Sequence, residues 1–196
     1  MGKIVISTNS SLDGVVQDPD GKEGSAPGGW FDRSIGEDRE PWARSFFEQA
    51  MSTDALLLGR RSAEWFAARW ASRTGPWAER LNALPKYVVS STATAAPWTN
   101  AALLTGDLPG NVAKLKREIP GEIAVYASYQ LLHALMTHDL VDELRLVVFP
   151  IVVGTGTRLF GENAGANPLH LAGASPLGKG LLSLTYRSTR DRPLGS

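Results

Sequence analysis

The sequence predicts an α/β protein in which a mixed β-sheet is flanked by helices. Over roughly the first 140 residues, short apolar runs alternate with segments whose apolar residues recur every three or four positions. This alternation predicts strands that are joined by helices and therefore run parallel. In the C-terminal part, strand-like runs follow one another without a convincing helix between them, which indicates antiparallel pairing at the edge of the sheet.

The N-terminal half begins with a strand over residues 3–7, which ends at the turn-forming segment Ser10–Gly14. A long irregular loop follows, with turn signals at residues 18–21 and 26–29, and such loops often bind ligands or form lids. Apolar periodicity then predicts two helices and two strands. In order these are a helix over 40–51, a strand over 55–58, a helix from about Gly59 that buries Ala63, Phe66, Ala67 and Trp70, and a strand over 86–91.

The C-terminal half continues this alternation and then becomes rich in strands. Short apolar runs predict the strands, and longer segments of helical periodicity predict the helices between them. The predicted elements are a short strand over 101–105, a helix over 111–119, a strand over 122–126, a helix over 128–138, and strands over 142–149 and 181–187.

Length and composition favour one domain that binds a small molecule. The 196 residues contain no linker-like block and 43% of them are hydrophobic, so we expect a single domain over residues 1–196. The 20 basic residues balance the 20 acidic ones, which gives no indication of nucleic-acid or membrane partners. There is no cysteine for disulfides or zinc, and no signal-like or membrane-spanning segment, so we expect a soluble, cytoplasmic protein.

Residues 54–62, Asp-Ala-Leu-Leu-Leu-Gly-Arg-Arg-Ser, predict a phosphate-binding site. An apolar strand there ends at Gly59, Arg60, Arg61 and Ser62, and an amphipathic helix begins. Glycine allows a ligand to approach the backbone, a helix N-terminus offers free N–H groups, and arginine offers paired donors that suit phosphate. The alternative interpretation is a plain helix start with solvated arginines.

Two further junctions strengthen the phosphate interpretation. Ser90 and Ser91 end the next strand, and if the two strands are parallel neighbours, their carboxyl ends open on the same crevice. Residues 127–131, Ala-Ser-Tyr-Gln-Leu, form a third strand-to-helix junction whose N–H groups suit a pyrophosphate. Two arginines and two serines at one crevice favour NADPH over NADH, because NADPH carries an extra phosphate.

Other motifs lack a required residue or spacing. Residues 173–180 nearly match a P-loop, but Gly180 replaces the hydroxyl that binds magnesium, so a turn-rich hairpin is the preferred interpretation. Gly154 begins a Gly-Thr-Gly segment without the third glycine of a dinucleotide fingerprint, which leaves either close approach to a cofactor or a plain turn. The histidine spacing predicts no metal site, and no Gly-x-Ser-x-Gly elbow supports hydrolysis.

An ordered set of motifs spans most of the chain: Ser11–Val16, Gly28–Trp30, Leu57–Ser62, Lys86–Ser90, Leu140–Leu144 and Pro150–Gly156. On this set, residues 3–186 resemble the dihydrofolate reductase-like family, which includes the C-terminal reductase domain of bacterial riboflavin biosynthesis proteins. The resemblance implies a three-layer α/β fold whose central, mostly parallel sheet has an antiparallel C-terminal edge and helices on both faces. It also implies hydride transfer from NADPH to a small molecule and, as in the riboflavin branch, a homodimer.

The resemblance assigns residues to the cofactor site by position. Ala127 and Ser128 stand where the family usually has Gly-Ser or Gly-Gly, so alanine restricts the backbone there. The bulky Tyr129 that follows either blocks the cofactor groove or points away from it. The implied cofactor residues are Gly59, Arg60, Arg61, Ser62, Ser90, Ser91, Ala127, Ser128, Tyr129, Gln130, Leu131 and Gly154.

On the substrate side, the resemblance implies a pocket for a planar heterocycle or enone. Dihydrofolate reductases place a pterin-binding carboxylate where this chain has Ala43, so folate is not the expected substrate. Asp13 is a catalytic acid, an anchor of the pocket or the cap of the turn before Gly14, and the pocket residues are Val15, Gln17, Trp30, Phe46 and Phe47. Three alternatives stay open: a riboflavin-pathway pyrimidine reductase, a reductase with a flavin-type cofactor, and a non-catalytic binding protein whose groove Tyr129 fills.

Overall fold

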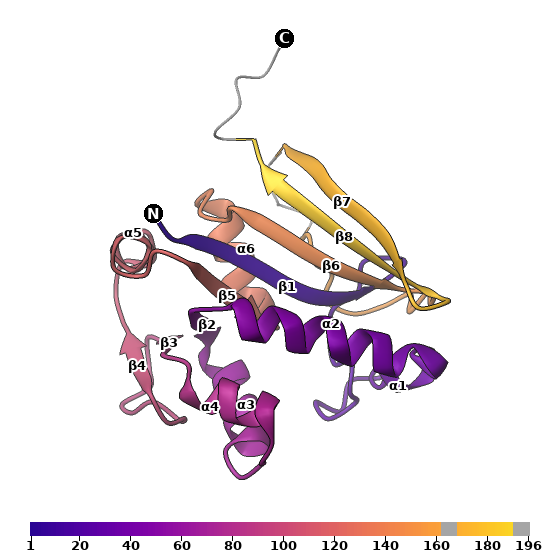
Figure 1. The fold of residues 1–196 in the computed structure, drawn as a ribbon, viewed down its shortest axis with the longest axis horizontal. Coiled ribbons are helices and arrows are strands. Elements are labelled where there is room, and N and C mark those ends of the chain that lie inside the picture. The colour runs from indigo at the N-terminus through magenta and orange to yellow at the C-terminus, as the bar shows by residue number, and fades with distance from the viewer. Residues whose placement is uncertain (162–167, 190–196) are drawn as a thin grey trace. The chain divides into compact units, whose positions relative to one another are not determined.

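In the computed structural model, which describes residues 1–161 and 168–189, every helix and strand predicted above is present (Figure 1). The strands are β1 (Lys3–Ser11), β2 (Ala55–Gly59), β3 (Lys86–Val89), β4 (Ala101–Leu104), β5 (Glu122–Tyr126), β6 (Glu143–Phe149), β7 (Leu169–Leu177) and β8 (Leu181–Ser188). The helices are α1 (Trp30–Ser34), α2 (Arg39–Ser52), α3 (Arg60–Trp70), α4 (Pro76–Ala83), α5 (Leu108–Glu118) and α6 (Tyr129–Thr137), with a 3₁₀ turn at Gly36–Asp38. No helix within the described ranges is long and apolar enough to cross a membrane.

The strands form a mixed sheet in the order β4-β3-β2-β5-β1-β6-β8-β7. β2 runs parallel to β3 and β5, and β3 runs parallel to β4. β8 pairs antiparallel with β6 on one side and with β7 on the other. The predicted α/β class, with a mostly parallel sheet and an antiparallel C-terminal edge, is therefore confirmed.

The chain divides into two compact units. Unit 1 consists of residues 1–6 and 46–141, and unit 2 consists of residues 7–45 and 142–196. Both β1 and α2 contribute residues to each unit. The single domain expected over residues 1–196 stays a prediction.

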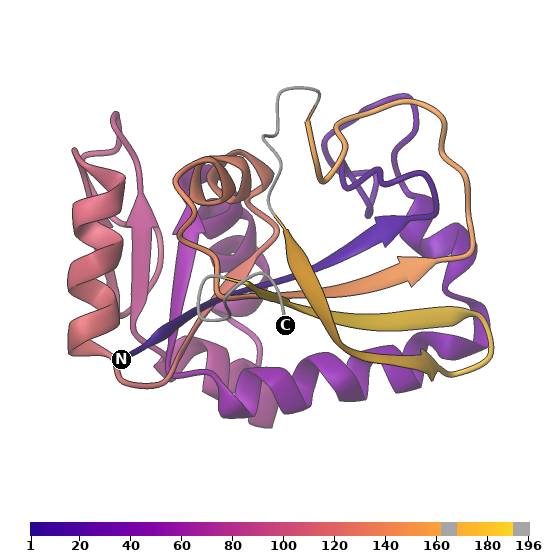
Figure 2. The ribbon, with the colours of Figure 1, turned by 90° about the horizontal axis from the view of Figure 1, so that it is seen from above.

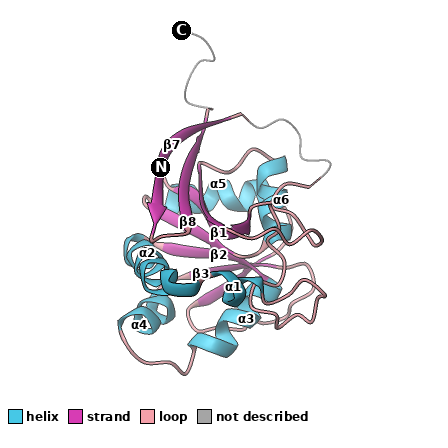
Figure 3. Cartoon of the chain, turned by 90° about the vertical axis from the view of Figure 1, so that its right-hand side faces the viewer, coloured by secondary structure: helices cyan, strands magenta, loops and turns pink. Residues whose placement is uncertain are grey.

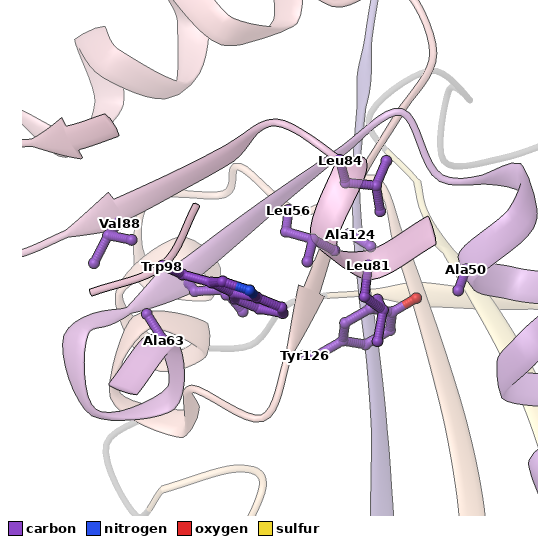
Figure 4. Close-up of a cluster of buried hydrophobic side chains, with 10 residues drawn as sticks. Ala50, Leu56, Ala63, Leu81, Leu84, Val88, Trp98, Ala124 and Tyr126 are labelled. Carbon is purple, nitrogen blue, oxygen red and sulfur yellow. The ribbon is translucent and has the colours of Figure 1, made fainter. Parts of the chain in front are cut away.

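The core of unit 1 is built on β2, β3 and β5. Side chains of a strand point alternately to its two faces, and one face packs against α3 and α4 in a buried cluster (Figure 4). Its members are Ala50, Leu56, Leu58, Ala63, Leu81, Leu84, Val88, Trp98, Ala124 and Tyr126. Phe66, Ala67 and Trp70 pack against the cluster, which confirms the apolar face predicted for α3. The alternate strand residues, such as Leu57 and Val125, are also fully buried, so both faces of these strands are covered.

Lys86, at the start of β3, is a buried cation that has no carboxylate partner among the described residues. Its Nζ donates to the carbonyl oxygen of Asn82 in the last turn of α4, at 3.0 Å, and to that of Leu84, just past the end of the helix, at 2.7 Å. The same nitrogen lies 4.5 Å from the centroid of the Trp98 ring. Burial lowers the pKa of the Lys86 ammonium from 10.5 to about 8.

This shift predicts that the protein becomes more stable as the pH rises from about 8 to about 10.5. In that window the unfolded chain still binds a proton at Lys86 and the folded chain does not, so raising the pH favours the folded state. Urea unfolding at several pH values should show a rise on the order of 1–3 kcal/mol in wild type relative to Lys86→Met. Equal pH dependence of the two proteins would contradict the assignment.

In unit 2, β7 and β8 form a hairpin (Figure 2). The turn lies at residues 178–180, and residues 173–177, which the sequence predicted as part of a turn-rich connection, belong to β7. The N–H groups of Lys179 and Gly180 in the turn each donate to a carboxylate oxygen of Asp38 at 2.7 Å. These backbone hydrogen bonds lower the pKa of Asp38. The P-loop-like segment therefore binds an anion, but that anion is a carboxylate of the same chain.

Three elements were not predicted: α1, α4 and β7. β7 contains Gly173 and Pro176, which disfavour central strands, and it is tolerated because it lies at one end of the strand order. α4 begins with Pro76 after Gly75, a helix-start signal that the surrounding sequence does not extend into a long periodic pattern. α1 has only five residues, too few for periodicity to show.

Candidate functional site

Three junctions of unit 1 open at the same edge of the sheet. The β2–β3 register pairs Gly59 with Val89, so Arg60 and Ser90 each follow a paired residue. β5 runs parallel to β2 on its other side and ends at Tyr126, so α3, the loop after β3 and α6 leave from the ends of neighbouring parallel strands. Figure 3 labels β2, β3, α3 and α6. We call residues 59–62, 90–91 and 127–131 the junction edge. The predicted parallel pairing of the strands before Gly59 and Ser90 is confirmed.

Two hydrogen bonds join the junctions after β2 and β5. The Gly59 N–H donates to Ser128 Oγ at 3.0 Å, and the Ser128 N–H donates to Ser62 Oγ at 3.0 Å. Ser62 Oγ thus accepts one hydrogen bond, and among the described residues its hydroxyl hydrogen has no acceptor, so it is available to a ligand. Ser128 is only 7% exposed, so this pair of bonds, which we call the Ser128 clamp, is largely shielded from water.

The backbone at Ala127 and Ser128 is left-handed at both residues. Their φ angles are 49° and 55°. A Cβ atom makes this conformation unfavourable by roughly 1–2 kcal/mol per residue, and glycine escapes that cost. Strained backbone of this kind persists where the surrounding structure holds it, and it clusters at binding sites.

The first turns of α3 and α6 have no side-chain cap. Gly59 precedes α3 and has no side chain, and Ser128 precedes α6 but directs its hydroxyl to Gly59. By contrast, Asp107 caps α5 by accepting the Gly110 N–H at 2.8 Å. The uncapped N–H groups of α3 and α6 carry the positive ends of two helix dipoles to the junction edge, where they suit an anion.

Arg60 and Arg61 differ in their surroundings. Arg60 Nη1 lies 2.9 Å from Glu64 Oε1, one helical turn along α3, and both side chains are partly exposed. Arg61 is exposed and forms no hydrogen bond or ion pair with any residue that the structure describes. An exposed pair such as Arg60–Glu64 contributes little to stability, so either guanidinium is able to turn towards a phosphate.

The remaining predicted cofactor residues of unit 1 differ in what they offer. Ser90 Oγ accepts the N–H groups two and three residues further on, at 3.2 and 2.9 Å, and so shapes the loop after β3. Ser91 and Gln130 are exposed, and Tyr129 is partly buried. The Leu131 side chain is buried in the core, so only its backbone is available to a ligand.

In unit 2, Asp13 holds a loop in place. Its carboxylate accepts the N–H groups of Val153 at 3.0 Å and Gly154 at 2.8 Å and the Ser11 hydroxyl at 2.7 Å. The bond from Val153, with those from Ser11 and Gly154, lowers the pKa of Asp13 to about 2. A carboxyl with this pKa is ionised near neutral pH, and here it serves as a hydrogen-bond acceptor both within its own turn, from Ser11, and for residues 153 and 154. A role of Asp13 as catalytic acid stays a prediction.

Asp13→Asn should loosen residues 153 and 154. The amide side chain keeps one acceptor oxygen, so one of the two N–H groups loses its partner, at a cost of about 1–2 kcal/mol in local stability. Hydrogen exchange should then speed up about tenfold at Val153 or Gly154, with Asp20→Asn as the control. In wild type, the stabilisation from the hydrogen bonds of Val153 and Gly154 to the Asp13 carboxylate is complete above about pH 4. It is lost as the pH falls towards 2, because the pKa of Asp13 is lower in the folded chain than in the unfolded chain. Unchanged exchange in Asp13→Asn would contradict this.

Three residues predicted for the substrate pocket have structural roles in unit 2. Trp30 and Val15 are completely buried. The Trp30 ring packs edge-on against Phe149, with centroids 5.5 Å apart, and its Nε1 donates to the Gln17 carbonyl at 2.8 Å. Gln17 Oε1 accepts the Thr157 N–H at 2.9 Å. Trp30 is therefore a core side chain in this structure, and its contact with substrate stays a prediction.

Phe46 and Phe47 belong to unit 1 and are partly buried on α2. The Phe47 ring meets Trp77 of α4 edge-on, with centroids 6.3 Å apart. Phe47 therefore helps to attach α4, and a contact of either ring with substrate stays a prediction.

Asp18 organises the loop at residues 18–29, a role that the sequence did not indicate. The residue is 1% exposed, and its carboxylate accepts the Glu23 N–H at 3.0 Å and both the N–H and the hydroxyl of Ser25 at 2.9 Å. Burial alone would raise the pKa of Asp18, but these hydrogen bonds outweigh burial and lower it. The Asp-Pro-Asp-Gly signal predicts a turn and gives no sign of the donors that gather around the carboxylate.

Similarity to known proteins extends along nearly the whole chain. The RibD C-terminal domain family model matches residues 2–183. The uncharacterised protein YwjB of Bacillus subtilis (strain 168) is 24% identical over 177 residues, which cover 90% of this chain and 93% of that protein.

Two solved structures share the fold. A protein from Shewanella sp. PV-4 that is named for riboflavin biosynthesis aligns with a TM-score of 0.76 and 22% identity, covering 96% of this chain and 99% of that one. Dihydrofolate reductase from Enterococcus faecalis, solved as a complex with NADP(H), aligns with a TM-score of 0.62 and 16% identity, covering 95% and 96%. The dihydrofolate reductase-like fold expected from the motif order is confirmed.

Proposed function

The chain belongs to the RibD C-terminal domain family, and from this we propose that it is an NADPH-dependent reductase. It would transfer hydride to a small planar substrate other than dihydrofolate. Family membership supports a reductase, and the NADP(H) complex of a protein with the same fold supports the cofactor. The nicotinamide supplies the hydride when it is bound, and the residues of this chain bind and orient the cofactor.

The observation that carries the proposal is that the uncapped N-termini of α3 and α6 lie together, joined by the hydrogen bond from the Gly59 N–H to Ser128 Oγ. Gly59 has φ −73° and ψ 156°, an extended backbone that any residue adopts. A Cβ atom built there would lie 3.7 Å from Ser128 Oγ, an ordinary contact. The fold itself therefore does not require glycine at this position, and the close approach of a ligand gives a reason for it.

Each part of the junction edge has a role in this proposal. The N–H groups in the first turns of α3 and α6 would hold the pyrophosphate, with the free hydrogen of the Ser62 hydroxyl. Arg60 or Arg61, with Ser90 and Ser91, would bind the phosphate that distinguishes NADPH from NADH. Gly154 belongs to unit 2, and its N–H already binds Asp13, so we leave it out of the proposed cofactor contacts.

Titration with NADPH tests the proposal, with the shift of nicotinamide fluorescence as the readout. We expect binding in the micromolar range, and Gly59→Val should weaken it because a branched side chain would occupy the place of the ligand while the backbone angles still suit valine. Flavin mononucleotide added as a competitor tests the alternative cofactor. No binding at about 1 mM NADPH would contradict the proposal, because this is weaker than ordinary cellular use allows.

The substrate class follows from what the chain lacks. Ala43 cannot form the paired hydrogen bonds that a carboxylate makes to a pterin, so we exclude folate from the proposal. A riboflavin-pathway pyrimidine reductase is the second candidate, supported by the family match and by the Shewanella protein. NADPH oxidation in the presence of pyrimidines, enones and dihydrofolate would separate these substrates, and turnover of dihydrofolate would overturn the exclusion.

We also propose a homodimer, because the edge strand β7 invites pairing. Residues 171–176 of β7 are exposed and β7 contains no Asp, Glu, Lys or Arg to repel a second strand. Pro176 and the register shift between Leu171 and Gly173 confine such pairing to part of the strand. Light scattering should give twice the chain mass of 21.1 kDa for wild type and a single chain mass for Ala174→Lys. A wild-type mass of one chain would contradict the dimer.

A further inference from the structure

We propose that Ser128 is a positioning residue of the cofactor site: through the Ser128 clamp it fixes the N-termini of α3 and α6 in the one arrangement that binds a dinucleotide. The inference rests on the proposed function and adds a residue whose side chain need not touch the cofactor. It starts from two hydrogen bonds of 3.0 Å that run in opposite directions between residues 66 or 69 positions apart.

The direction of the Ser128 hydroxyl is the unusual feature. A serine that precedes a helix normally accepts an N–H from the first turn of that same helix. Here the hydroxyl of Ser128 accepts the Gly59 N–H from the neighbouring junction, and it makes no cap bond to α6. Two effects follow: the N–H groups of α6 stay available, and the start of α3 is tied to the start of α6.

The left-handed backbone is what makes this arrangement possible. At φ 55° and ψ 43°, Ser128 points its N–H at Ser62 and its hydroxyl at Gly59, after Ala127 at φ 49°. Glycine would adopt this backbone without strain, but glycine has no hydroxyl to accept the Gly59 N–H. Compared with glycine, serine at this position costs backbone strain but supplies the hydroxyl that joins the starts of α3 and α6.

Ser128→Gly separates positioning from stability. The substitution removes the clamp hydroxyl and relieves the strained backbone at the same residue, so we expect a melting temperature within about 3 °C of wild type. NADPH affinity should nevertheless fall about tenfold, and the Gly59 amide should exchange hydrogen faster because it has lost its acceptor. A role in stability alone would leave the affinity unchanged.

The matched control is Asp139→Gly, which relieves a positive φ of 51° just beyond the other end of α6. It should keep the wild-type affinity, which shows that added backbone freedom near α6 does not by itself weaken binding. Wild-type affinity in Ser128→Gly, or an equal loss in both variants, would overturn the inference while the proposed function stands. A wild-type chain that binds no dinucleotide would overturn the proposed function and the inference with it.

Discussion

Trp30→Ala should lower the free energy of unfolding by about 3–5 kcal/mol, the range measured when large aromatic side chains are removed from well-packed cores. The Trp30 side chain is completely buried, packs edge-on against Phe149, and donates its indole N–H to the Gln17 carbonyl. Removing it leaves a cavity and an acceptor without its donor. Urea unfolding that follows intrinsic fluorescence would measure the loss.

Two variants separate the contributions of Trp30. Trp30→Phe keeps a ring in the cavity and removes the indole N–H, so we expect a smaller loss of about 1–2 kcal/mol. Trp65→Ala removes a partly buried tryptophan that lies beneath the Arg69 guanidinium, 3.9 Å from the ring centroid, and should cost less than Trp30→Ala. A Trp30→Ala protein as stable as wild type but impaired in substrate binding would contradict the core role and support the pocket role that the sequence suggested.

Arg61→Ala should weaken NADPH binding more than NADH binding, by about 1.5–3 kcal/mol, or roughly ten- to a hundredfold. The extra phosphate of NADPH needs a cation, and Arg61 is exposed with no ion-pair partner among the described residues. Arg60→Ala should act in the same direction but more weakly, because Glu64 already binds the Arg60 guanidinium. Parallel titrations with NADPH and NADH would measure the difference.

Glu64→Gln and Lys114→Ala complete this test. Glu64→Gln releases Arg60, so affinity for NADPH should rise relative to NADH. Lys114→Ala removes one exposed positive charge from α5 and should leave the ratio of the two affinities unchanged. Equal losses of NADPH and NADH binding in Arg60→Ala and Arg61→Ala would remove both arginines from the phosphate site.

Local patterns predicted most of the fold. The apolar run of β2 and the helical spacing of α3 each reflect burial on a defined face, and the core of unit 1 buries those faces. β7 was not predicted because its Gly, Ala, Ser and Pro residues have little intrinsic preference for strands. Its hydrogen bonds to β8, and not its own composition, make it a strand.

The sequence predicted which strand-to-helix junctions form the candidate site, but it did not predict the hydrogen bonds that join them. Strand ends followed by glycine, arginine and serine indicated the junction edge, because the carboxyl ends of parallel strands meet at one edge. The Ser128 clamp joins residues 66 and 69 positions apart, and no local pattern encodes such a contact. The structural roles of Asp13 and Trp30 were not predictable for the same reason, since distant partners set the pKa of one and the burial of the other.

A crystal structure of the chain with NADPH would show whether the cofactor binds at the junction edge. We expect pyrophosphate oxygens within hydrogen-bond distance of N–H groups in the first turns of α3 and α6, with the Ser128 clamp intact. We also expect an arginine guanidinium from the start of α3 at the additional phosphate. A nucleotide bound away from residues 59–62 and 127–131, or a Tyr129 ring lying in the place of the pyrophosphate, would contradict the proposed cofactor site.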